Sequence, residues 1–137
     1  MKRILSFACM LVLLGLQNLE AGPVRVYMDQ KDGRRSTDFY LAGPDQSPAI
    51  LIDGRDAIVV RKAAELFAGD LHAVTGREAR VTESTERLRS CVLVGTLEGC
   101  EWIRELVDAG KIDPTPIRGG WERYLIQSVR LPMPGMK

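Results

Sequence analysis

The densest group of side chains that could bind a ligand or transfer a proton is Asp53-Gly54-Arg55-Asp56, which directly follows a short apolar run. Two carboxylates beside a guanidinium could bind a cation or a sugar hydroxyl. Calcium takes about 6–8 oxygen ligands, however, and the sequence lacks the remaining ligands of an EF-hand loop. We therefore predict a tight turn in which Asp56 caps the following helix by accepting hydrogen bonds from its free backbone N–H groups.

Glycoside hydrolysis needs a facing pair of carboxyl groups, one of which acts as the acid. The chain carries many further carboxylates, but none has a recognisable catalytic setting, and we expect solvated positions on helix surfaces or loops. The candidates are Glu65, Asp70, Glu78, Glu83, Glu86, Glu98, Glu101 and Glu105.

The single histidine, His72, is predicted on the exposed polar side of a helix. Neither HExxH nor a Cys/His ligand spacing occurs, and no GxSxG elbow is present. The sequence therefore predicts no catalytic residue, no metal site and no cofactor, and it identifies no binding residue.

Two further motifs favour structural roles. Val94-Gly95-Thr96 before a helix is typical of a phosphate-cradling turn, but the GxGxxG and GxxxxGK[ST] patterns are absent, so we expect a plain strand-to-helix turn. Trp121 and Tyr124 could form a sugar-stacking platform. In the strand predicted there they point to opposite faces, so one is expected in the core, as is Trp102.

Cys91 and Cys100 are predicted to be separate thiols. Cys91 begins an apparent strand and Cys100 an apparent helix beyond its far end. Four extended residues span about 13 Å, whereas a disulfide needs Cα atoms within about 7 Å. We expect Cys91 to be buried and Cys100 to lie at a helix N-terminus, a position that can lower a thiol pKa.

The N-terminal residues have the outline of a secretory signal peptide over 1–21. Lys2 and Arg3 precede an apolar run at 4–16, and Ala21 offers a small residue for cleavage. The run is shorter than the about 20 residues that span a bilayer, although an uncleaved anchor is the alternative. We expect a secreted or periplasmic protein without a membrane partner after cleavage. A leading segment at 22–47, with short strands at 24–28 and 39–42, follows.

Residues 48–137 are expected to form an α/β domain of the order β-α-β-β-α-β. Strands are predicted at 49–52, 79–82, 91–94 and 121–129, with 84–90 as an exposed connection and 91–94 as a central strand. One helix ends at Gly76 and another near Gly110. The economical packing is an α+β sandwich, a mixed or antiparallel sheet with both helices on one face. The first helix buries the stripe Val60, Ala63, Phe67, Leu71 and Val74.

The composition of the 137-residue chain is that of an ordinary globular protein, with 45% hydrophobic residues, 27% charged residues and a net charge of +1. Lysine and arginine are dispersed, so no patch that could follow a phosphate backbone is visible. We expect no nucleic-acid partner.

Several ordered motifs resemble one family. The runs ILIDGRDAIVVRKAAELFAGDLHAVTGREARV, VLVGTLEG, LVDAGKID and RGGWERYLIQSV are similar to the N-terminal region of glycoside hydrolase family 115, the xylan α-1,2-glucuronidases. The resemblance implies an accessory domain like the second domain of β-hexosaminidases, preceding a (β/α)8 barrel that holds the catalytic carboxylates. It implies that residues 48–137 are an incomplete accessory domain, inactive alone, and that glucuronoxylan is reached only through the barrel.

Two other functions stay open at this point. The chain could be a free-standing binding module that recruits a partner through an exposed strand at 121–129 by β-augmentation. It could also be a small unrelated α/β enzyme, for which a catalytic constellation is lacking. The sequence predicts no particular oligomeric state.

Overall fold

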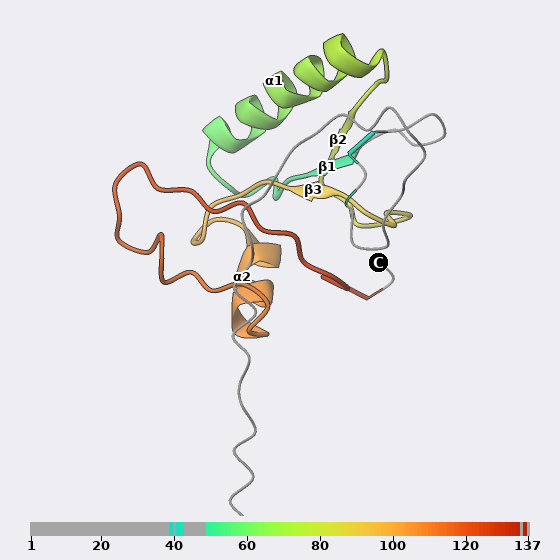
Figure 1. Cartoon of the computed structure of the whole chain (residues 1–137). Helices are drawn as coiled ribbons and strands as arrows, with labels where there is room; N and C mark the ends of the chain where they lie inside the picture. The colour runs from blue at the N-terminus through green and yellow to red at the C-terminus, as the bar shows by residue number, and fades with distance from the viewer. Residues whose placement is uncertain (1–38, 40, 43–48, 135, 137) are drawn as a thin grey trace, which may run out of the picture.

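The protein is a small α/β protein with a three-stranded parallel sheet and two helices (Figure 1). The computed structural model describes residues 39, 41–42, 49–134 and 136. The predicted signal peptide, the strand at 24–28 and most of the leading segment lie outside the described residues. The elements are β1 (Ala49–Leu51), α1 (Ile58–Thr75), β2 (Arg80–Thr82), β3 (Val92–Leu93) and α2 (Glu101–Asp108).

The sheet has the order β2-β1-β3, and both pairings are parallel. Ile50 pairs with Val81 on one side and with Val92 on the other. The prediction of a mixed or antiparallel sheet was therefore wrong, as was the central position of 91–94, because β1 lies between the other two strands. Ala49–Leu51 takes the centre because it is a continuous apolar run, the composition typical of a strand covered on both faces.

The two helices lie on opposite faces of the sheet, α1 above the strands and α2 below them in Figure 1, and not on one face as predicted. Alternate residues of a strand point to opposite faces. Ile50 and Ile52 accordingly pack with Val60 of α1, whereas Leu51 joins a second cluster with Leu88. The side chains of that second cluster extend to α2, where half-buried Trp102 packs against it, as the core prediction expected.

Helix α1 buries Val60, Ala64 and Leu71, so Ala63 and Val74 of the predicted stripe were assigned wrongly. An 18-residue helix is about 27 Å long, whereas strands of two or three residues cover about 10 Å. The sheet therefore reaches only part of the helix, and Val74 in its last turn stays exposed. Gly76 ends the helix as predicted, in the left-handed conformation with its N–H bonded to the carbonyl of His72.

Residues 121–129 form no strand, although their alternation predicted one. The backbone turns at Glu122, which has a positive φ of 54°. The segment is held to the end of α2 by side-chain bonds in place of a ladder: Gln127 Nε2 donates to the Lys111 carbonyl, and Lys111 Nζ to the Leu131 carbonyl. Trp121 and Tyr124 are 89% and 82% exposed, so neither belongs to the core.

Two further predictions concern the segments at 39–42 and 84–90. Phe39, Leu41 and Ala42 are not in a strand, and Tyr40 lies outside the described residues. The connection at 84–90 is largely exposed as predicted, apart from buried Leu88.

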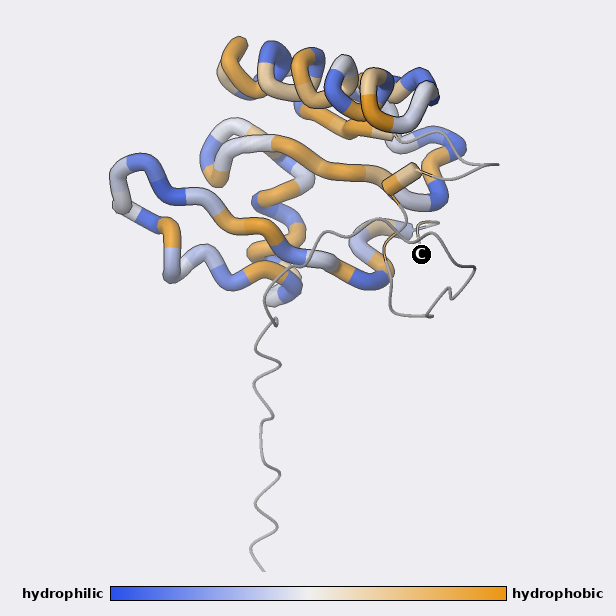
Figure 2. The backbone as a smooth tube through the Cα atoms, turned by 45° about the horizontal axis from the view of Figure 1, so that its top comes forward, coloured by the Kyte–Doolittle hydropathy of each residue, from blue (hydrophilic) through white to orange (hydrophobic). Residues whose placement is uncertain are grey.

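Apolar segments gather in the strands of the sheet, whereas apolar and polar residues alternate along α1 (Figure 2). Within the part of the chain that the structure describes, neither helix combines the length and the apolar character needed to cross a membrane.

Candidate functional site

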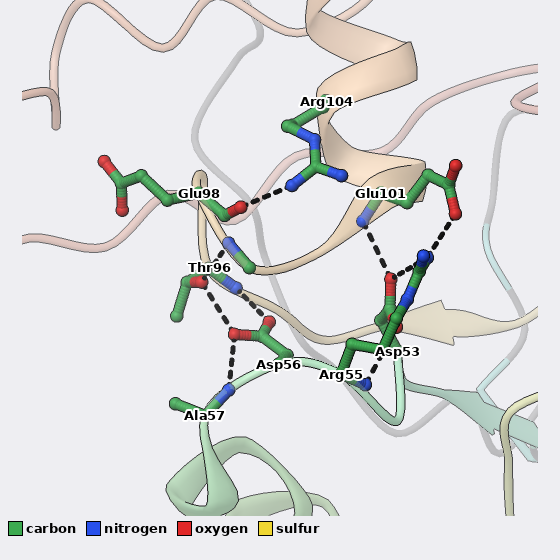
Figure 3. Close-up of polar contacts among 9 residues, drawn as sticks. Asp53, Arg55, Asp56, Ala57, Thr96, Glu98, Glu101 and Arg104 are labelled. Carbon is green, nitrogen blue, oxygen red and sulfur yellow. Dashed lines mark hydrogen bonds and ion pairs between the residues drawn. The ribbon is translucent and has the colours of Figure 1, made fainter.

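The loops after β1 and β3 meet at the carboxyl edge of the sheet. From β1 the chain passes through α1 to β2, whereas β3 pairs on the other side of β1 and leads to α2 on the opposite face. In open α/β sheets, ligands bind outside the carboxyl ends of the strands at such a change of direction. The polar cluster Asp53-Gly54-Arg55-Asp56 and the Gly95-Thr96 turn both lie there (Figure 3), which makes this edge the candidate site.

Asp53 connects the turn after β1 to the first residue of α2. Its Oδ1 accepts the backbone N–H of Arg55 at 3.0 Å, and its Oδ2 accepts the backbone N–H of Glu101 at 2.9 Å. The Arg55 guanidinium holds both carboxylate oxygens at 3.1 Å and also contacts the Glu101 carboxylate. A carboxylate beside the first N–H groups of a helix stabilises it through the helix dipole.

Asp56 joins the two loops and does not cap α1, so the predicted cap was wrong. The N-cap residue is Ala57, without a side-chain cap bond. Asp56 Oδ1 accepts the Ala57 N–H and the Thr96 hydroxyl, each at 2.7 Å, and Oδ2 accepts the Thr96 N–H at 2.7 Å. Asp56 does not bond to the first turn of α1 because the loop after β3 offers it two donors together, the N–H and the hydroxyl of Thr96.

Glycines permit this close approach of the loops. A Cβ built on Gly99 would lie 2.1 Å from Asp56 Oδ1, and one on Gly95 would lie 2.5 Å from the Cβ of buried Cys100. The Thr96 hydroxyl also accepts the Gly99 N–H at 2.9 Å. The predicted strand-to-helix turn is thus confirmed, with a packing reason for each glycine.

The hydrogen bonds fix the charge state of the cluster. The Arg55 guanidinium and the backbone N–H groups of Glu101 and Arg55 hold the pKa of the Asp53 carboxyl well below its usual range. Burial raises the pKa of Asp56, but the donors of Thr96 and Ala57 outweigh it and leave that pKa lowered. Both side chains are therefore anionic acceptors at neutral pH. A general acid needs the opposite shift, so these carboxylates suit structural bonding better than proton donation.

Of the other candidate residues, Glu101 joins this cluster through its contact with Arg55, and the rest lie apart from it. All eight acidic side chains from Glu65 to Glu105 named above are exposed, as predicted. Four of them make surface pairs: Glu65 with Lys62, Glu83 with Arg61, Glu101 with Arg55, and Glu78 with His72, whose Nδ1 lies 3.6 Å from the carboxylate. His72 is exposed as predicted, and the described residues contain no group of three or more potential metal ligands.

The two thiols are free and Cys100 stands at the N-terminus of α2, as predicted, but Cys91 is not the more buried of the two. Cys100 is fully buried, whereas Cys91 is half-buried. Burial raises the pKa of both thiols, so the helix N-terminus does not activate Cys100. Desolvation outweighs the helix dipole there because the sulfur lies under the Gly95 turn.

A depression elsewhere on the surface is lined by Thr85, Arg87, Leu88, Arg89 and Pro134. Its two arginines give it positive charge, and its lining holds no carboxylate or histidine. It therefore lacks the acid–base pair of a hydrolytic site.

The cluster at the carboxyl edge, with Asp53, Asp56 and Thr96 at its centre, is the best-defined polar arrangement of the described residues. Sequence reasoning identified the aspartates and the Thr96 turn separately and missed that they bind each other. A sequence signal for this contact exists, because polar and small residues follow the strands of two βα units. The carboxyl ends of such strands lie at the same edge when the strands are parallel.

The chain matches no protein-family model and no curated protein sequence. The fold and the cluster together define a small α/β unit with its polar contacts concentrated between two βα loops.

Proposed function

We propose that this chain is the non-catalytic N-terminal accessory domain of a secreted glycoside hydrolase that removes glucuronic acid, or its 4-O-methyl form, from xylan. The proposal rests on the resemblance to family 115 and on the βα order of the chain. The same proposal includes a fold like that of the second domain of β-hexosaminidases. The active carboxylates would then lie in a separate (β/α)8 barrel.

The observation that carries the accessory role is the use of the carboxylates at the switch point. Asp53 accepts four hydrogen bonds from Arg55 and Glu101, and Asp56 accepts three from Ala57 and Thr96. Groups committed in this way hold loops and helices together and leave few lone pairs for substrate. Such a cluster supports a scaffold role for the domain.

The test begins with the DNA downstream of codon 137. We expect a continuing reading frame that encodes a barrel, whose product releases 4-O-methylglucuronic acid from glucuronoxylan, while the 137-residue chain alone releases none. Asp53→Asn and Asp56→Asn in the long product should lower stability and leave the ratio of kcat to KM at low temperature within about threefold of wild type, a difference of about 0.6 kcal/mol. Release of the acid by the 137-residue chain would overturn the proposal.

A second candidate is a free-standing secreted binding module. The exposure of Trp121 and Tyr124 favours it, because exposed aromatic rings are enriched at protein interfaces. Without a strand at 121–129, however, β-augmentation loses its template. A stop at codon 138, with a folded and inactive chain that binds glucuronoxylan in an affinity gel and loses binding on Trp121→Ala, would favour this candidate.

A further inference from the structure

The outer side of α1 carries an apolar stripe that nothing in the described part of the chain covers. Ile58, Val59, Leu66 and Val74 are each between 64% and 73% exposed. They lie on the side of the helix away from Val60, Ala64 and Leu71, the residues that face the sheet. Exposed apolar patches rimmed by polar residues mark interaction sites.

The stripe is symmetric about Leu66. On this side of the helix, each exposed residue before Leu66 has a counterpart of matching chemistry at the same spacing after it. Ile58 matches Val74, Val59 matches Ala73, Ala63 matches Gly69, and Lys62 matches Asp70 with opposite charge. At about 100° per residue, every one of these side chains falls within a single half of the helix surface.

Such a pattern fits a second copy of the same helix. An antiparallel pair with its two-fold axis at Leu66 places residues equally far before and after Leu66 level with each other, and an isologous contact makes each pairing twice. Lys62 then meets the partner's Asp70, and Asp70 the partner's Lys62. The small residues Ala63, Gly69 and Ala73 let the helices approach to about 8 Å, the lower end of helix packing distances.

We propose that α1 forms a two-fold antiparallel contact between two copies of this chain, centred on Leu66. The contact uses residues that take no part in the core or in the carboxyl-edge cluster, so it does not depend on the proposed function. Lys62 already holds Glu65 at 2.8 Å, but an exposed pair of this kind contributes at most about 1 kcal/mol. The ammonium has three donors and can therefore bind the partner's Asp70 as well.

A contact between single helices is small, so the dimer should be weak and concentration-dependent. Sedimentation of the purified chain, in the form in which it is exported, is expected to show a monomer–dimer equilibrium. Lys62→Asp and Asp70→Lys should each weaken the dimer at least tenfold, because each creates two like-charge contacts. The double variant Lys62→Asp/Asp70→Lys should restore it. Glu105→Lys in α2, on the opposite side of the sheet, is the charge-matched control for Asp70→Lys.

A cross-linking experiment checks the position of the axis. In a Cys91→Ser background of the exported chain, Leu66→Cys should form a disulfide with its own copy, since a residue on a two-fold axis lies beside itself. Thr75→Cys, near the end of the same helix, should not. Circular dichroism establishes that each variant is folded.

A chain that stays monomeric at all concentrations would overturn the proposal. So would a dimer that Lys62→Asp leaves intact or that the charge-swapped double variant fails to restore. A face covered by another segment of this chain, by a further domain or by a lipid surface would give one of these outcomes.

Discussion

Asp56 and Thr96 lie forty positions apart in the chain, yet two hydrogen bonds of 2.7 Å join the carboxylate of one to the N–H and the hydroxyl of the other. The contact ties the loop after β1 to the loop after β3 at the carboxyl edge of the sheet (Figure 3). It therefore fixes how the two βα units sit beside each other, a task that short strands perform weakly alone.

The Thr96 hydroxyl should contribute measurably to stability. Thr96→Val keeps the shape of the side chain but removes the bond from the hydroxyl to Asp56 and the bond that the hydroxyl accepts from the Gly99 N–H. Hydrogen bonds to charged groups contribute about 1.5–3 kcal/mol. We expect the free energy of unfolding in urea to fall by that order. Thr96→Ser keeps the hydroxyl, so its free energy of unfolding should fall much less. Equal losses in the two variants would show that the methyl group, and not the hydroxyl, matters.

The Asp53 carboxylate should make stability depend on acid. Its pKa in the folded protein lies below its unfolded value, so its contribution is complete above the unfolded pKa of about 3.9 and is lost as the pH falls below it. Urea unfolding followed from about pH 7 downward should therefore give steadily lower stability in acid.

Asp53→Asn should be less stable at neutral pH and should depend less on pH in the acid range. Arg55→Gln removes the main cause of the lowered pKa and should weaken the acid dependence in the same direction. An unchanged slope in both variants would mean that other carboxylates dominate acid unfolding.

Gly95 and Gly54 follow neighbouring strands but should respond differently to alanine. The new Cβ at Gly95 meets the Cβ of buried Cys100 at 2.5 Å, where nothing flexible can yield. Overpacking of this kind costs about 1–3 kcal/mol. At Gly54 the Cβ meets only the end of the exposed Glu83 side chain, so we expect a change within about 0.5 kcal/mol. Thermal unfolding of the two variants makes the comparison, and similar losses would contradict it.

The two thiols should differ in reactivity. In the exported chain, half-buried Cys91 should react slowly with a disulfide reagent at mildly alkaline pH, because its pKa is raised by burial. Fully buried Cys100 should react only when the protein unfolds. Mass spectrometry after timed labelling distinguishes the two sites. Rapid labelling of Cys100 in the folded protein would indicate that the Gly95 turn opens readily.

The local elements followed from the sequence because their signals are local. The 3.6-residue period located both helices, and Gly76 ended the first of them through its left-handed conformation. The apolar run at Ala49–Leu51 predicted a strand, and the exposure of the acidic residues followed from their place on polar faces. These outcomes need no knowledge of which segments lie side by side.

Apart from the burial of Ala63 and Val74 on α1, the main wrong predictions concern contacts between distant residues. The alternation at 121–129 is present, but a strand also needs a partner, and side-chain bonds to Lys111 hold this segment elsewhere. Asp56 was predicted to cap its own helix because that bond is local, whereas Thr96 offers two donors from another loop. Burial of Cys100 likewise depends on the approach of the Gly95 turn.

The sequence by itself determined where the helices and the three strands lie and that the chain is an α/β protein. The tertiary structure alone decided the parallel pairing on both sides of β1, the placement of the helices on opposite faces and the joining of Asp53 and Asp56 to the second βα loop. The physical reason is that periodicity records how each element is exposed, while strand order and loop contacts depend on competition among partners that are far apart in the chain.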